Sequence, residues 1–124
     1  MNKETGIVQR TYDFSVRIAK MCRAIDARGT DLVLVKQVMR SGTSIGANVE
    51  EAQGGHTRRD FVAKMSIAYK EARETKYWLK IMRDIEMVPA KKLEQLIDEG
   101  GQILKILASI LLTTKSNSPK SPEE

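Results

Sequence analysis

Residues 35–61 read VKQVMRSGTSIGANVEEAQGGHTRRDF, and their pattern predicts two helices with a sharp break between them. The apolar and small residues of the first part recur at steps of three and four, which puts them on one side of a helix. Gly54-Gly55 then interrupts the period. Thr57, followed by Asp60, resembles a capping box that starts the next helix. The core stripe predicted for the first helix of this pair is Val35, Val38, Gly42, Ile45, Val49 and Ala52.

One further segment before this pair and one after it have the same helical period, so the chain is predicted to form four helices. They cover about Ile7–Arg28, Leu32–Gln53, Thr57–Glu86 and Pro89–Lys115. No segment alternates with period two for long enough to predict a strand. Because short connections favour antiparallel neighbours, we expect an all-α, up-and-down four-helix bundle in residues 1–115. A polar, flexible tail is expected in residues 116–124.

The ends of the first helix and the start of the second have recognisable signals. Gly29 is expected to take a left-handed conformation that ends the first helix, and Thr30 or Asp31 is expected to cap the second. The apolar face assigned to the first helix consists of Tyr12, Val16, Ala19, Cys22 and Ile25.

The third and fourth predicted helices carry more apolar surface than one bundle buries. The core stripe of the third helix is Phe61, Met65, Ala68, Ala72 and Leu79. Five more apolar residues widen the arc to about 200°, against the ~100° that a surface helix commonly buries: Ile67, Trp78, Ile81, Met82 and Ile85. Self-association is the economical explanation, through an interface that includes Ile67, Trp78, Ile81 and Ile106. The alternative is irregular packing with scattered exposed apolar residues.

Residues suited to catalysis are scarce. His56 is the only histidine, which excludes metal sites built from several histidines. Cys22 lies on an apolar face, where cysteine usually acts as a small core residue, and no phosphate-binding glycine loop is present. We therefore expect no enzyme, no metal, no cofactor and no small-molecule substrate. The sequence contains no signal peptide and no apolar run of ~20 residues, so a cytoplasmic protein without membrane contact is expected.

The second helix also carries small and polar residues with structural roles. Gly42, Gly46 and Ala47 are interpreted as sites of close helix packing, because glycine inside a helix costs about 1 kcal/mol and calls for compensation. Polar residues form a stripe beside the apolar one. A catalytic role would need a cleft and an acid–base partner, so we favour an interhelical hydrogen-bond network formed by Ser44, Asn48, Glu51 and Glu74.

Basic residues form a ridge on the third helix. The chain has 21 Lys and Arg against 16 Asp and Glu, a net charge of +5. At 100° per residue, four cations fall within an arc of about 80°, with Arg58 aligned at the far end. This basic ridge consists of Arg58, Arg73, Lys76, Lys80 and Arg83. It is either an ordinary solvated face or a surface that follows a phosphate backbone.

The same stretches resemble a known family. Gln37-Val38-Met39-Arg40, the run from Ser44 to Ala52 and the Thr57-Arg58-Arg59-Asp60-Phe61 segment are similar to the 23S rRNA intervening-sequence proteins. The similarity runs from about Tyr12 to Leu112. The departures are Gly46 for proline, Ala52 for glycine, and Gly55-His56 where the family usually has basic residues.

The resemblance implies an up-down-up-down bundle that assembles as a homo-oligomeric ring, with a pentamer favoured, and no established enzymatic reaction. A more distant similarity is to the accessory protein of diversity-generating retroelements, a basic pentamer that binds nucleic acid and a reverse transcriptase. Our functional prediction is a non-enzymatic homo-oligomer that binds RNA or DNA through phosphate contacts with little base discrimination. The alternative is a protein–protein interaction scaffold of unknown partner.

Overall fold

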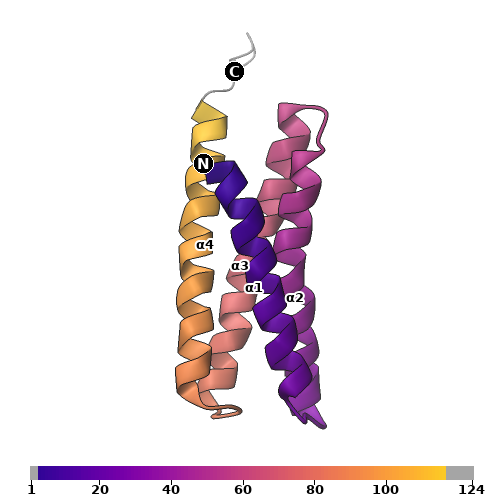
Figure 1. Ribbon diagram of the computed structural model, residues 1–124, viewed down its shortest axis with the longest axis vertical. Helices are drawn as coiled ribbons and strands as arrows, with labels where there is room; N and C mark the ends of the chain where they lie inside the picture. Colours follow the sequence, from indigo (N-terminus) through magenta and orange to yellow (C-terminus); the bar gives the residue numbers. More distant parts are fainter. Residues whose placement is uncertain (1–2, 117–124) are drawn as a thin grey trace.

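The computed structural model describes residues 3–116, and all of its regular structure is helical. The helices are α1 (Lys3–Ala24), α2 (Thr30–Gln53), α3 (Arg58–Asp84) and α4 (Ala90–Ser116). Figure 1 shows them alternating in direction along one long axis. The prediction of an all-α bundle of four helices is therefore confirmed. The tail predicted for 116–124 lies outside the described residues apart from Ser116, which is the last residue of α4.

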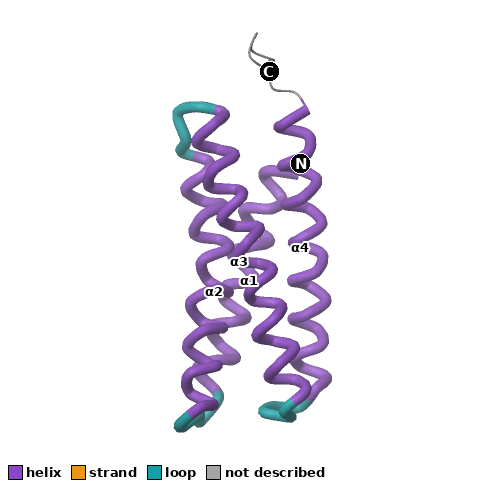
Figure 2. Tube along the Cα trace, turned by 180° about the vertical axis from the view of Figure 1, so that it is seen from behind, coloured by secondary structure: helices purple, strands orange, loops and turns teal. Residues whose placement is uncertain are grey.

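Each helix packs against the next along the chain, and α4 packs against α1 to complete the bundle. The helix α1 therefore lies between α2 and α4, with α3 diagonally across from it. Figures 1 and 2 show the short connections at the two ends of the bundle and show α1 crossing it obliquely. Toward the C-terminal end of α1 the ribbon of this helix leans toward α2 and away from α4.

The core of α2 is the one predicted, and that of α3 extends further. All six residues of the stripe expected on α2 are buried. On α3, Met65, Ala68, Ala72 and Leu79 are buried as expected, whereas Phe61 is half-buried. Met82, which we placed outside the stripe, is fully buried. Its position continues the stripe through Thr75, a buried residue whose hydroxyl donates to the Glu71 carbonyl at 2.7 Å.

The face predicted for α1 is correct at Cys22, which is buried, and wrong at Tyr12, which is exposed. Tyr12 is 63% exposed, and the residues that enter the core are Ile7, Phe14, Ile18, Met21 and Cys22. The reason is Thr11, which occupies a core position of this series and is fully buried. Its hydroxyl donates to the Ile7 carbonyl at 2.7 Å, so the polar group has a partner inside its own helix and its burial costs little.

The helix ends agree with the predicted signals in part. Gly29 has the expected positive φ, 59°, but its ψ of −131° is not that of a left-handed helical residue, and α1 ends earlier, at Ala24. Gly29 itself is the N-cap of α2, and no side chain caps that helix. At the start of α3 the expected cap is present, since Thr57 accepts a hydrogen bond from the Asp60 amide at 3.0 Å.

Two glycines of α2 allow α1 to approach closely. A Cβ on Gly42 would lie 2.9 Å from the Ile18 side chain. A Cβ on Gly46 would lie 3.0 Å from the Thr11 carbonyl oxygen and 3.1 Å from the Ser15 hydroxyl. Both glycines therefore have the packing role expected of them. Ala47 does not, because it is exposed.

Cys22 is a core residue of α1, only 6% exposed. Its thiol lies 3.8 Å from the Val35 carbonyl oxygen, which accepts a weak hydrogen bond from it. Burial raises the pKa of the Cys22 thiol from 9.0 to about 11, because the thiolate would lose its solvation. At neutral pH the side chain is a protonated thiol, unsuited to nucleophilic attack.

Gly46→Leu should lower the free energy of unfolding by about 1 to 3 kcal/mol, because the side chain would meet the α1 backbone, which yields less easily than a side chain. Denaturant unfolding measures the effect. Gly6→Ala is the matched control, since a Cβ at Gly6 meets nothing within 4 Å. It should stabilise the protein by about 0.5 to 1 kcal/mol through helix propensity. Equal or higher stability for Gly46→Leu would contradict the close approach.

The Cys22 thiol should also make stability depend on alkaline pH. The unfolded thiol ionises near 9.0 and the folded one near 11, so its contribution is complete below pH 9 and is lost between pH 9 and 11. Relative to Cys22→Ala, the wild type should lose about 2 to 3 kcal/mol of unfolding free energy over that window. Parallel pH dependences of the two proteins would show that the thiol is solvated.

Candidate nucleic-acid interface

The five cations of the basic ridge lie along α3, but their surroundings differ. Arg58, Arg73 and Lys80 are exposed, and Lys76 and Arg83 are half-buried. Among the side chains of residues 6–116, no carboxylate lies within ion-pair distance of Arg73 or Lys80. These two residues are the cations of the ridge most available to an external anion.

Arg83 is paired within its own helix. Its Nε lies 2.8 Å from Oδ1 of Asp84, and its Nη2 lies 3.4 Å from Oδ2. The hydrogen bond from Arg83 holds the pKa of the Asp84 carboxyl below its usual value and raises the pKa of the guanidinium. The charge of Arg83 is thus balanced locally, which reduces its attraction for a phosphate.

Lys76 faces the neighbouring helix. It lines an open groove of about 300 Å³ between α3 and α4 together with Glu94, Asp98 and Lys105. A Cβ on Gly101 would lie 3.5 Å from the Lys76 Nζ, so the missing side chain leaves room for the ammonium group beside α4. The two carboxylates that share the groove reduce the positive potential at this end of the ridge.

The polar residues predicted to form one network lie in three separate sets of contacts. Asn48 Nδ2 donates to the Ser44 carbonyl at 2.8 Å and lies 3.2 Å from the Ser44 hydroxyl, both within α2. Glu51 pairs with Lys64 of α3 at 3.3 Å. Glu74 accepts hydrogen bonds from Arg40 and from the Trp78 indole.

Sequence reasoning placed Glu51 and Glu74 in contacts between helices but missed their partners and two further contacts between α2 and α3. Arg40 of α2 pairs with both Glu71 and Glu74 of α3, the former at 3.2 Å. In the core between α2 and α3, the hydroxyls of Ser41 and Thr75 lie 2.9 Å apart, within hydrogen-bond distance. The signal for this pair was present, because both residues occupy positions at core spacing.

A two-pronged ion pair joins α1 to α4. Arg10 Nε lies 2.7 Å from Oε2 of Glu99, and its Nη2 lies 2.9 Å from the other carboxylate oxygen. The hydrogen bond that Arg10 donates to Glu99 raises the pKa of the Arg10 guanidinium. Bidentate geometry fixes orientation as well as distance. No pattern within either helix pointed to it, because the partners are 89 positions apart.

The residues assigned to an oligomer interface are covered to different degrees. Ile67 is 40% exposed, whereas Trp78, Ile81 and Ile106 are half-buried. Trp78 and Ile106 pack against the core of their own chain. Trp78 Nε1 donates to Glu74 Oε2 at 2.9 Å, and its ring meets that of Tyr77 edge-on, with centroids 5.2 Å apart.

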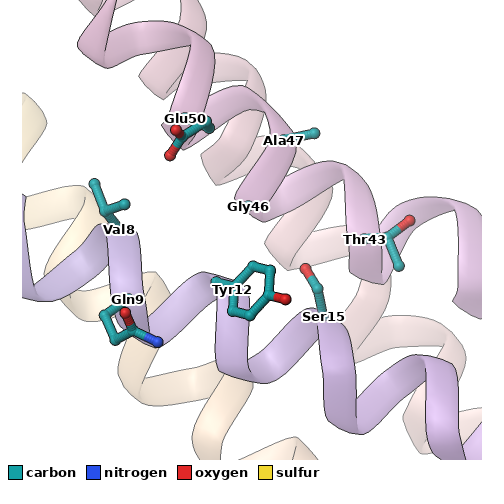
Figure 3. A pocket seen from close by; sticks show the side chains of 8 residues that line it. All are labelled: Val8, Gln9, Tyr12, Ser15, Thr43, Gly46, Ala47 and Glu50. Atoms are coloured by element: carbon teal, nitrogen blue, oxygen red, sulfur yellow. The ribbon is translucent and has the colours of Figure 1, made fainter.

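The sequence analysis also did not predict an apolar groove that lies away from α3. It lies between α1 and α2, has a volume of about 670 Å³, and is lined by Val8, Gln9, Tyr12, Ser15, Thr43, Gly46, Ala47 and Glu50. Figure 3 shows the Tyr12 ring and the Ser15 hydroxyl from α1 facing the bare backbone of α2 at Gly46. The groove contains no histidine or cysteine, and its one carboxylate, Glu50, has no basic side chain beside it in the lining. This arrangement suits contact rather than acid–base chemistry.

A metal site requires several ligating side chains close together, and a membrane span requires a long apolar helix. Among the side chains described for residues 6–116, no three His, Cys, Asp or Glu lie together as a metal ion would require. No helix in this part of the chain is long and apolar enough to cross a membrane.

Comparison with known proteins places the fold in a family. No curated protein matches the chain. A crystal structure of a protein of unknown function from the S23 ribosomal protein family of Bacteroides thetaiotaomicron VPI-5482 is 36% identical, with a TM-score of 0.83. The similarity covers 90% of this chain and 99% of that one. Residues 3–109 match the model of the 23S rRNA-intervening sequence proteins. The resemblance seen in the sequence is thereby confirmed, and the chain belongs to the 23S rRNA-intervening sequence protein family.

Proposed function

We propose that this chain is a non-enzymatic, homo-oligomeric helical bundle that binds RNA or DNA through phosphate contacts along the basic ridge of α3. The observation that carries the proposal is the exposure of Arg73 and Lys80 without an ion-pair partner among the described residues. An unpaired surface cation gains more from a phosphate than a paired one, because no internal contact has to be broken.

RNA is the first nucleic acid to test, because the family description names an intervening sequence of 23S rRNA. Base reading is not part of the proposal. The ridge carries Arg and Lys, which suit phosphate oxygens, and it has no row of aromatic side chains on which unpaired bases would stack. We therefore expect affinity to vary little with sequence and strongly with salt.

Assembly into a ring, with five copies favoured, is the second part of the proposal. Its support is the apolar surface left exposed on α3 and at its C-cap, where Ile67 is 40%, Tyr77 60% and Ile85 53% exposed. Several copies of a weak ridge acting on one strand would raise the effective concentration of each after the first has bound.

A protein-interaction scaffold remains the alternative function, and the groove between α1 and α2 favours it. Tyr12 stands 63% exposed in that groove, and tyrosine is a common anchor of protein interfaces. A scaffold would bind no nucleic acid, which separates the two functions in one binding experiment.

The double variant Arg73→Gln/Lys80→Gln should weaken binding to RNA of any sequence. Removing one phosphate contact should reduce the slope of log K against log salt by about one unit per subunit engaged. Fluorescence anisotropy at several salt concentrations gives both quantities. Arg59→Gln/Lys115→Gln is the matched control, because it removes one Arg and one Lys that are also exposed and lie off the ridge. Equal effects of the two double variants would refute a specific role of the ridge, and absence of wild-type binding would favour the scaffold.

Ile67→Glu should weaken assembly, because a carboxylate in an apolar interface must be desolvated without a partner. Light scattering should give the wild type a mass several times the 13.9 kDa of one chain, with five copies favoured. The variant should have a lower mass. Trp78→Glu should act in the same way, although it also costs fold stability because Trp78 packs on the core. Val33→Glu, at a 59% exposed position on α2, is the control and should keep the wild-type mass. A monomeric wild type at micromolar concentration would refute this part.

A further inference from the structure

A second group of cations surrounds a pocket that the basic ridge does not include. The pocket lies between α1 and α4, has a volume of about 310 Å³, and is lined by Arg17, Lys20, Met21, Lys92, Gln95 and Leu96. Three of these six residues are cations, and none is acidic. Its α1 residues belong to the C-terminal half of that helix, which leans away from α4 in Figure 1.

The backbone of the pocket is held by the core. Met21 is 6% and Leu96 4% exposed, and both belong to the hydrophobic core of the bundle. Arg17 and Lys20 are three residues apart, so they share one face of α1. Lys92 belongs to the first turn of α4, the positive end of that helix. Two packed helices thus present three exposed cations to a common space.

These cations lack partners inside the chain. Among the side chains of residues 6–116, none of the three lies within 4.0 Å of a carboxylate. Arg10, two turns earlier on α1, shows the contrast, since Glu99 of α4 reaches it with both oxygens. Like charges around one pocket repel one another, and an anion between them would turn that repulsion into attraction.

We propose that the pocket between α1 and α4 binds a phosphate group. Arg17 offers the planar fork of donors that matches two phosphate oxygens, Lys20 and Lys92 offer point charges, and the Gln95 amide offers a neutral donor. The apolar floor lowers the local dielectric and strengthens these contacts. The phosphate comes either from a nucleic-acid backbone or from a free phosphate compound.

The surroundings of the pocket favour the backbone of RNA as the source. Lys20 also lines a neighbouring groove between α1 and α2, together with Arg23 and Lys36. Neither of these two residues forms an ion pair among the described residues. The basic surface therefore continues from α4 across α1 to α2, along which successive phosphates of one strand would find cations. The pocket does not depend on the ridge, because α1 lies diagonally across the bundle from α3.

The test compares Arg17→Gln/Lys20→Gln/Lys92→Gln with a control that removes the same number of charges elsewhere, Arg59→Gln/Lys70→Gln/Lys115→Gln. Each variant loses one Arg and two Lys, all exposed, so the net charge falls from +5 to +2 in both. Circular dichroism checks that both remain helical. The two probes are inorganic pyrophosphate by calorimetry and a short RNA duplex by anisotropy, at ionic strength held constant with chloride.

We expect the wild type and the control to bind one pyrophosphate per chain and the pocket variant to lose at least about tenfold in affinity. If the pocket variant also loses more RNA affinity than the control, the bound phosphate belongs to the RNA backbone. Loss of pyrophosphate binding with equal RNA affinities identifies a free phosphate compound instead. If the pocket variant matches the control with both probes, the proposal is overturned.

The ridge variant keeps this test separate from the proposed function. Arg73→Gln/Lys80→Gln should retain pyrophosphate binding, because neither residue lines the pocket. If the proposal for the ridge is wrong, pyrophosphate should still bind to the pocket. If the proposal for the pocket is wrong, the ridge variant should still lower the salt dependence of RNA binding.

Discussion

The close approach of α1 and α2 at Gly46 is the constraint on which the other features depend. With no side chain at Gly46, the Thr11 carbonyl and the Ser15 hydroxyl can lie against the α2 backbone. Gly42 repeats the arrangement one turn away with Ile18. The two contacts fix α1 against α2, and from this follow the groove beside Tyr12 and the pocket that opens between α1 and α4. The packing of the helices therefore determines which exposed charged side chains lie near one another.

Ion pairs divide the cations of the molecule into two classes. Arg10 and Arg40 are occupied in holding helices together, the first between α1 and α4 and the second between α2 and α3. Exposed pairs of this kind contribute about 0 to 1 kcal/mol each, so their larger effect is to fix the orientation of one helix against another. Among the described residues, the cations without an ion-pair partner include Arg73 and Lys80 on α3, Arg17 and Lys20 on α1, and Lys92 on α4. The electrostatic character of the surface depends more on this division than on the net charge.

Two buried threonines, Thr11 and Thr75, show where prediction of the fold from the sequence succeeds and where it fails. Helix number, the core of α2 and the cap at Thr57 follow from local patterns, and the structure confirms them. The faces of α1 and of the end of α3 were assigned less well because Thr11 and Thr75 occupy core positions. A hydroxyl bonded to the carbonyl four residues earlier needs no partner from another helix, so it can be buried where a search for apolar residues finds a gap.

The candidate sites were harder to predict than the fold. Arg10 meets Glu99, and Arg17 and Lys20 share a pocket with Lys92, only because α1 and α4 are neighbours in space. A helical wheel shows which residues share a face of one helix, and it cannot show which cations face carboxylates on another. For the ridge, the wheel identified the right face but not the pairing of Arg83 with Asp84 or the placement of Lys76 beside α4.

Trp78 gives the protein an internal optical probe. It is the only tryptophan, so all indole fluorescence of the folded chain comes from one half-buried ring on α3. Because that ring donates to Glu74, which Arg40 of α2 also contacts, its emission depends on the junction of two helices. A partner that covers this face would shift the emission to shorter wavelength by removing water from the indole, whereas a ligand that binds only between α1 and α4 would leave it unchanged. One spectrum therefore distinguishes the two sides of the bundle.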